Sequence, residues 1–154
     1  MSLERPIDLE CPNCGLAQTA VVWDSLNADV SPGARAALFE GKINVFACEA
    51  CGHQARLDAP LLYHDMARRF VVQYYPFEMI AGAEFRERFD ADGTVRSVVD
   101  AVRASLPTDA GTAMAYMARP HLVFDMDELI RYIQFREAVH DARQRDNPTT
   151  ESEP

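Results

Sequence analysis

Apolar and polar positions in the first third of the chain follow the spacing of short β-strands interrupted by one helix. β-branched and aromatic residues cluster at 7–10 and 16–24, and 42–46 repeats the pattern,. Between them, 32–40 has helical spacing. Ser31 is a candidate N-cap, Pro32 suits the first helical turn, and Gly41 is placed to end the helix. The pattern predicts two strand-rich segments separated by helix 32–40.

Three further apolar runs follow, at 53–58, 60–65 and 69–75, with turn signals between them,. The connections between the runs are too short for parallel crossovers. We therefore predict a meander of antiparallel strands.

Beyond residue 77 the spacing becomes helical. It predicts helices at 81–89 and 94–106 with a turn at 89–93, whereas 111–119 fits either strand or helix,. A strand at 121–125 precedes a final helix, 126–143, for which Asp125 and Glu128 form a candidate capping box. The apolar stripe of that helix, which either packs on the sheet or covers a second subunit, contains Leu129, Ile130, Ile133 and Val139,.

Four cysteines form the pattern Cys11-x-x-Cys14 and Cys48-x-x-Cys51. Two-residue spacing lets both sulfurs of a pair reach one tetrahedral zinc ion at about 2.3 Å, and two pairs complete a closed site. Gly15 and Gly52 follow the pairs, where a knuckle turn often needs a positive φ. The spacer, 15–47, is longer than in a compact zinc ribbon, and helix 32–40 accounts for the excess as an insertion.

Other chemistries for these thiols are open but less favoured. A Cys₄ set also fits a single iron ion. A redox dithiol is expected at the start of a helix, whereas these pairs lie between strands. Four sulfurs leave no open coordination position for catalysis, although His53 could displace one of them. We expect His53 to pack beside the knuckle or to donate a hydrogen bond to it.

Two histidines lie near carboxylates, His64 beside Asp65 and His121 near Asp125. Neither pair has a neighbouring serine or uncommitted cysteine to act as a nucleophile. We expect ordinary structural histidines and no enzymatic activity.

The net charge of −9 disfavours nucleic acid, because it repels phosphate backbones and Lys42 is the sole lysine,. The sequence predicts no signal peptide and no membrane span, so we expect a cytoplasmic protein whose reduced cysteines bind metal.

"CPNCG", "GKINVFACEACGH", "APLLYHDMARRFVVQYYP" and "HLVFDMDELIRYIQFREAVHDA" together resemble the CpXC family of bacteria and archaea over residues 7–142. The resemblance implies a zinc-ribbon-like fold with Cys11, Cys14, Cys48 and Cys51 as ligands. It also matches Tyr63, His64 and Asp65 to the family's strand end. The second knuckle departs from the pattern, because Glu49 stands where the motif has proline.

We therefore predict an α+β fold: a zinc-ribbon-like antiparallel sheet with a helical insertion, extended by further strands and flanked by C-terminal helices. One domain would span 1–145, with a ribbon half at 7–60 and the meander and helices at 61–145, followed by a disordered acidic tail at 146–154,. The predicted function is a non-catalytic structural zinc domain that binds a protein partner, with a homodimer through the C-terminal helix as one form. A nucleic-acid-binding or transcription-related ribbon is the alternative, and a zinc- or thiol-dependent enzyme ranks third.

Overall fold

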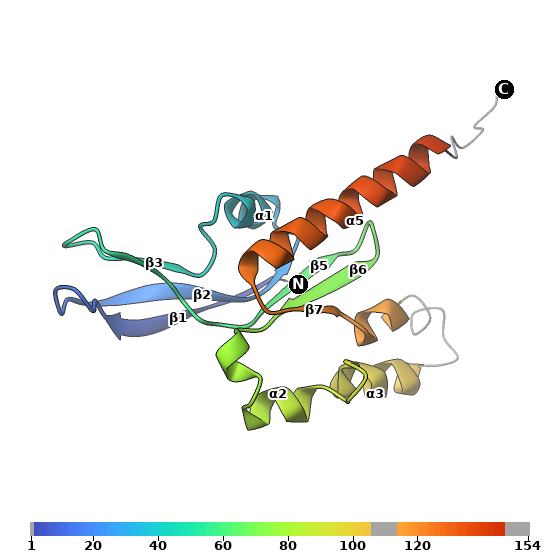
Figure 1. The fold of residues 1–154 in the computed structure, drawn as a ribbon, viewed down its shortest axis with the longest axis horizontal. Helices are drawn as coiled ribbons and strands as arrows, with labels where there is room; N and C mark the ends of the chain where they lie inside the picture. The colour runs from blue at the N-terminus through green and yellow to red at the C-terminus, as the bar shows by residue number, and fades with distance from the viewer. Residues whose placement is uncertain (1, 106–113, 147–154) are drawn as a thin grey trace.

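The computed structural model describes residues 2–105 and 114–146 (Figure 1). Six of the seven strands lie in the first half of the chain, and most of the helical residues lie in the second. In chain order the elements are β1 (Leu3–Glu10), β2 (Ala17–Asn27), α1 (Pro32–Phe39), β3 (Val45–Ala47), β4 (Gln54–Arg56), β5 (Leu61–Asp65), β6 (Phe70–Tyr74), η1 (Phe77–Met79), α2 (Ala83–Arg88), α3 (Arg96–Ser105), η2 (Ala115–Ala118), β7 (His121–Val123) and α5 (Met126–Asp146).

The main sheet has five strands in the order β1-β2-β5-β6-β7, and β3 with β4 forms a separate hairpin. The α+β class is confirmed, but the sheet is mixed where an antiparallel one was predicted, and within the predicted meander only β5 and β6 pair with each other. The pairs β1–β2 and β5–β6 are antiparallel, whereas β2–β5 and β6–β7 are parallel. Parallel pairing is possible because the chain between β2 and β5 contains α1 and the β3–β4 hairpin, and the chain between β6 and β7 contains several helices,.

The principal core lies between this sheet and the helices α1 and α5, which Figure 1 shows on the same side of the sheet. Tyr63 and Val72 contribute from the sheet and Leu38 from α1. Leu129 and Ile133 of α5 are fully buried there. Three of the four residues of the predicted stripe therefore pack within the chain, with Ile130 half-buried against the same core, whereas Val139 is not part of it.

The ends of the helices follow from local hydrogen bonding. Gly41 has φ +70° and donates its N–H to Leu38, while Lys42 donates to Ala37, so a Schellman motif ends α1 as predicted,. Ser31 is at the N-cap but makes no side-chain capping bond. At the start of α5, Asp125 Oδ1 accepts from the backbone N–H groups of residues 127 and 128,.

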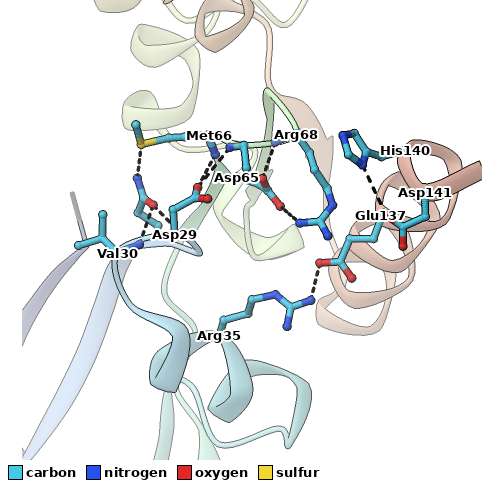
Figure 2. Close-up of polar contacts among 11 residues, drawn as sticks. Asp29, Val30, Arg35, Asp65, Met66, Arg68, Glu137, His140 and Asp141 are labelled. Atoms are coloured by element: carbon cyan, nitrogen blue, oxygen red, sulfur yellow. Dashed lines mark hydrogen bonds and ion pairs between the residues drawn. The ribbon is translucent and has the colours of Figure 1, made fainter. Parts of the chain in front are cut away.

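Polar side chains join α1 to α5, and the loop before α1 to the turn between β5 and β6 (Figure 2). Asp29 accepts a hydrogen bond at 2.7 Å from the backbone N–H of Met66. Arg35 of α1 makes an ion pair with Glu137 of α5. These contacts fix the two helices and the turn at the end of the sheet away from the cysteines.

Residues 115–118 of the ambiguous segment 111–119 form a 3₁₀ turn, and 111–113 lie outside the described residues. The final helix runs three residues beyond its predicted end, so Asp146 is helical rather than the start of a tail. The remainder of the predicted tail, 147–154, lies outside the described residues. Within the described ranges, no helix is long and apolar enough to cross a membrane.

Candidate metal centre

Two loops with the same backbone geometry carry the cysteines. In the first, between β1 and β2, the N–H of Cys11 donates to the carbonyl of Leu16 at 2.8 Å, and Gly15 N–H donates to the Cys11 carbonyl at 2.8 Å. In the second, between β3 and β4, Cys48 N–H donates to His53 at 2.8 Å, and Gly52 donates back to Cys48 at 2.9 Å. The two knuckles are therefore local copies of each other.

Both knuckles end in a left-handed glycine. Gly15 has φ +74° and Gly52 has φ +69°. A side chain at either position would meet open space, so the requirement for glycine comes from the backbone conformation and not from crowding,. This confirms the positive φ that the sequence predicted after each pair.

The four sulfurs converge on one point. All four Sγ atoms lie within 4.8 Å of one another. The Sγ atoms of Cys11 and Cys51 are 3.6 Å apart, and those of Cys14 and Cys48 are 3.5 Å apart. Sulfurs bound tetrahedrally at about 2.3 Å would be about 3.8 Å apart, so the spacing fits four ligands of one ion.

Each knuckle contributes one buried and one exposed sulfur residue. Cys11 and Cys48 are buried beside Phe46 in a small second core, whereas Cys14 and Cys51 are exposed. That core has three buried residues, two of which are the cysteines themselves, with Leu9, Ala20, Ala55 and Leu57 partly buried against it. Much of the buried surface that holds the β3–β4 hairpin against β1 and β2 therefore belongs to the cysteines.

The surroundings shift the pKa values of the two exposed thiols, Cys14 and Cys51, in opposite directions. Asn13 Nδ2 donates to Cys51 Sγ at 3.4 Å, and with the backbone N–H of His53 it lowers the pKa of Cys51 to about 6. The backbone N–H of Leu16 lowers the pKa of Cys14, but its hydrogen bond with Cys48 and the neighbouring sulfurs outweigh that effect and raise it to about 12. A bound cation would stabilise all four thiolates at once.

The other residues singled out from the sequence have structural partners. His53 contributes its backbone to the second knuckle. His64 Nε2 lies 2.6 Å from the hydroxyl of Tyr116, whereas Asp65 pairs with Arg68. His121 stacks on Tyr132, with ring centroids 3.7 Å apart, and its predicted partner Asp125 caps α5. The structure does not bring either histidine onto its neighbouring carboxylate.

Sequence reasoning missed three amide side chains that support the site. Asn13 bonds the Cys51 sulfur. Gln18 bridges the second knuckle, donating to the carbonyl of Ala47 at 3.0 Å and accepting from the N–H of Glu49 at 3.1 Å. Asn44 bonds the backbone of β2. Asn44 was the one residue that the sequence could have indicated. It interrupts the strand pattern at 42–46, and asparagine is depleted from strands and enriched at positive φ.

The fold and the four sulfurs define an α+β protein with two paired-cysteine knuckles that can hold a metal ion. The chain belongs to the CpXC protein family, whose model matches residues 9–144. Comparisons with curated proteins and with solved structures gave no match.

Proposed function

We propose that the chain is a non-catalytic structural zinc domain whose metal site holds the β3–β4 hairpin on the main sheet. The observation that carries the proposal is the convergence of four sulfurs from two matching knuckles within 4.8 Å. Four thiolates fill the coordination shell that zinc prefers and leave no position for substrate. Zinc is favoured over iron because a closed Cys₄ site at a ribbon-like pair of knuckles is its common structural setting.

A structural role for the ion agrees with the small number of other interactions that stabilise the β3–β4 hairpin. The strands β3 and β4 have three residues each, and a two-stranded hairpin is marginal in water,. The small core beside the cysteines adds few apolar contacts. The free energy of metal binding would therefore be free energy of folding for this part of the chain.

We further propose that the folded domain acts by binding another protein. Support comes from the acidic net charge of −9, which disfavours nucleic acid, and from apolar surface on α5,. Phe135 is 58% exposed, and Val139, one turn further along, is half-buried. Figure 1 shows the C-terminal end of α5 projecting beyond the sheet, where a second copy or another partner has access to the helix.

The metal proposal is tested by elemental analysis of the purified chain. We expect about one zinc per chain in the wild type and far less in a Cys11→Ser, Cys48→Ser double variant, with iron near zero in both. His53→Ala is the matched control, because it removes the neighbouring imidazole but no sulfur, and it should retain its zinc. A metal-free wild type that keeps the β3–β4 hairpin ordered would overturn the proposal.

The interaction proposal is tested with Phe135→Glu. If the partner is a second copy, light scattering should show a dimer for the wild type and a monomer for Phe135→Glu. If the partner is another protein, one protein from the host should bind the purified wild type and not Phe135→Glu. Gln134→Glu, which adds the same charge at the neighbouring position of α5, is the control. Identical mass and identical binding by wild type and Phe135→Glu would exclude this surface.

A further inference from the structure

An arginine-lined pocket lies away from the cysteines. It has a volume of about 450 Å³ and lies between the start of β6, η2, β7 and α5. In Figure 1, β7 and α5 are well separated from the loops that join β1 to β2 and β3 to β4. The side chains that matter here are Arg69, Tyr116, Arg119, His121, Tyr132 and Arg136.

Aromatic rings hold Arg136 in position. Its guanidinium carbon lies 4.9 Å from the centre of the Phe70 ring and 5.9 Å from that of Tyr132. Its Nη1 donates to the Tyr132 hydroxyl at 3.2 Å, and Tyr132 is itself stacked on His121. Within the described part of the chain, Arg136 has no carboxylate partner. A planar fork of donors is therefore fixed in advance with its charge uncompensated.

Two more arginines border the same pocket. Arg69 lies 5.5 Å from the Tyr116 ring centre and has φ +54°, a conformation that glycine would adopt at lower cost,. Arg119 is exposed and lies 3.5 Å from Asp92, which is also exposed, so its guanidinium can turn toward the pocket,. Among the lining residues that the structure describes, none is Asp or Glu.

The described lining of this pocket holds three arginines and no carboxylate, in a chain whose net charge is −9. Burial lowers the pKa of His121, so at neutral pH the charge of the pocket comes from the arginines and not from the imidazole. Guanidinium groups bind phosphate and carboxylate oxygens through paired hydrogen bonds, and the Tyr132 hydroxyl, which accepts from Arg136, keeps its own O–H as a further donor,. The net charge of −9 repels a long polyanion but not a small anion that enters a local basic pocket,.

We infer that this pocket binds the phosphoryl group of a small phosphorylated molecule, with Arg136 as the fixed donor and Arg119 as a mobile second donor. The inference goes beyond the metal site. No residue of either knuckle lines the pocket, so the two proposals can fail separately.

The test is calorimetric titration of the purified chain with inorganic phosphate, AMP and adenosine at low salt. We expect phosphate and AMP to bind and adenosine not to bind; tighter binding of AMP than of phosphate would identify a ring-bearing ligand. No heat from AMP and phosphate up to about 10 mM, or adenosine binding as tightly as AMP, would overturn the inference.

Variants assign the binding to the named side chains. Arg136→Gln and Arg119→Gln should each weaken AMP binding roughly tenfold or more, because each removes a charge-assisted hydrogen bond. Arg136→Lys keeps the charge and should still weaken binding, because lysine lacks the planar fork. Arg131→Gln is the control. It removes the same charge from α5, but Arg131 does not line the pocket and precedes Arg136 by five residues, about 140° around the helix,.

The variants also distinguish AMP binding at this pocket from non-specific attraction of AMP by the positive charges of the protein. Binding that weakens equally in Arg131→Gln and Arg119→Gln would reflect overall charge and would overturn the assignment. Because Arg136 also packs on Phe70, Arg136→Gln could lower stability, whereas exposed Arg119 makes few contacts. Unchanged AMP affinity in folded Arg119→Gln and Arg136→Lys would exclude the pocket.

Discussion

The side-chain amide of Asn44 binds both backbone polar groups of Trp23. Its Oδ1 accepts from the Trp23 N–H at 2.7 Å, and its Nδ2 donates to the Trp23 carbonyl at 3.1 Å. Asn44 is 1% exposed and has φ +53°. The amide thus supplies to β2 the pair of bonds that a neighbouring strand would supply, just before β3 begins.

Replacing Asn44 tests how much this bridge contributes. We expect Asn44→Ala to lower the free energy of unfolding by about 2 kcal/mol or more, because two backbone groups lose buried partners. Asn44→Gly also loses the amide but tolerates the positive φ, so it should be less damaging than alanine by about 1 kcal/mol. Urea unfolding measures both. An Asn44→Gly variant as stable as the wild type would show that water replaces the amide at little cost.

Removing the metal should loosen one end of the molecule and leave the rest folded. The core that contains Leu26, Tyr63 and Leu129 includes none of the four cysteines. We therefore expect a chelator to reduce amide hydrogen-exchange protection in β3 and β4 by tenfold or more, with less than about threefold change in β6 and α5. Uniform loss of protection along the chain would contradict this division.

The two knuckle glycines should respond alike to substitution. Gly15→Ala and Gly52→Ala each place a Cβ at positive φ with no steric contact, so each should cost about 1–2 kcal/mol from the backbone alone,. Gly33→Ala is the matched control, because Gly33 lies in the first turn of α1 and also faces open space. It should be neutral or slightly stabilising. Thermal unfolding of the zinc-loaded chains compares the three.

Two histidines should make the fold less stable in mild acid. Burial lowers the pKa of His64 and of His121 in the folded chain below the ordinary value of about 6.5,. The unfolded chain then binds more protons than the folded chain once the pH falls through 6.5. The free energy of unfolding should therefore drop from pH 7 toward pH 5, by at most about 1.4 kcal/mol per pH unit for each histidine.

A His64→Gln, His121→Gln double variant should show a shallower decline over the same range. Acid also protonates the thiols and releases metal, but that contribution is common to both proteins and cancels in the difference between them. His140→Gln, on the outer part of α5, controls for loss of one histidine. Parallel stability curves for the wild type and the double variant would exclude this cause.

The cysteine positions and their glycines could be predicted from the sequence because a knuckle is local: six consecutive residues determine its turn and its hydrogen bonds. The helix ends at Gly41 and Asp125 are local in the same sense. The strand order was not predictable in this way. Short connections correctly indicated that β5 and β6 are antiparallel, but β5 pairs on its other side with β2, more than thirty residues earlier. No local sequence pattern indicates that β5 pairs with β2.

The amide supports of the site were also beyond sequence reasoning. Gln18 and Asn44 matter because β3 passes close to β2 without joining its ladder, a relationship that exists only after the hairpin has been placed. The pocket around Arg136 combines residues from four elements in the same way. A site whose residues come from distant segments of the chain can be recognised only from the three-dimensional structure.

The parallel pairing of β2 with β5 has a consequence for the order of folding. A crossover closes late, because the entropy of ordering the intervening loop must be met before the strands gain contacts. The first cysteine pair is available as soon as β1 and β2 form a hairpin, whereas the second pair lies within the crossover itself, between β3 and β4. We expect an ion to be captured first by two sulfurs, and its full coordination to mark the completion of folding.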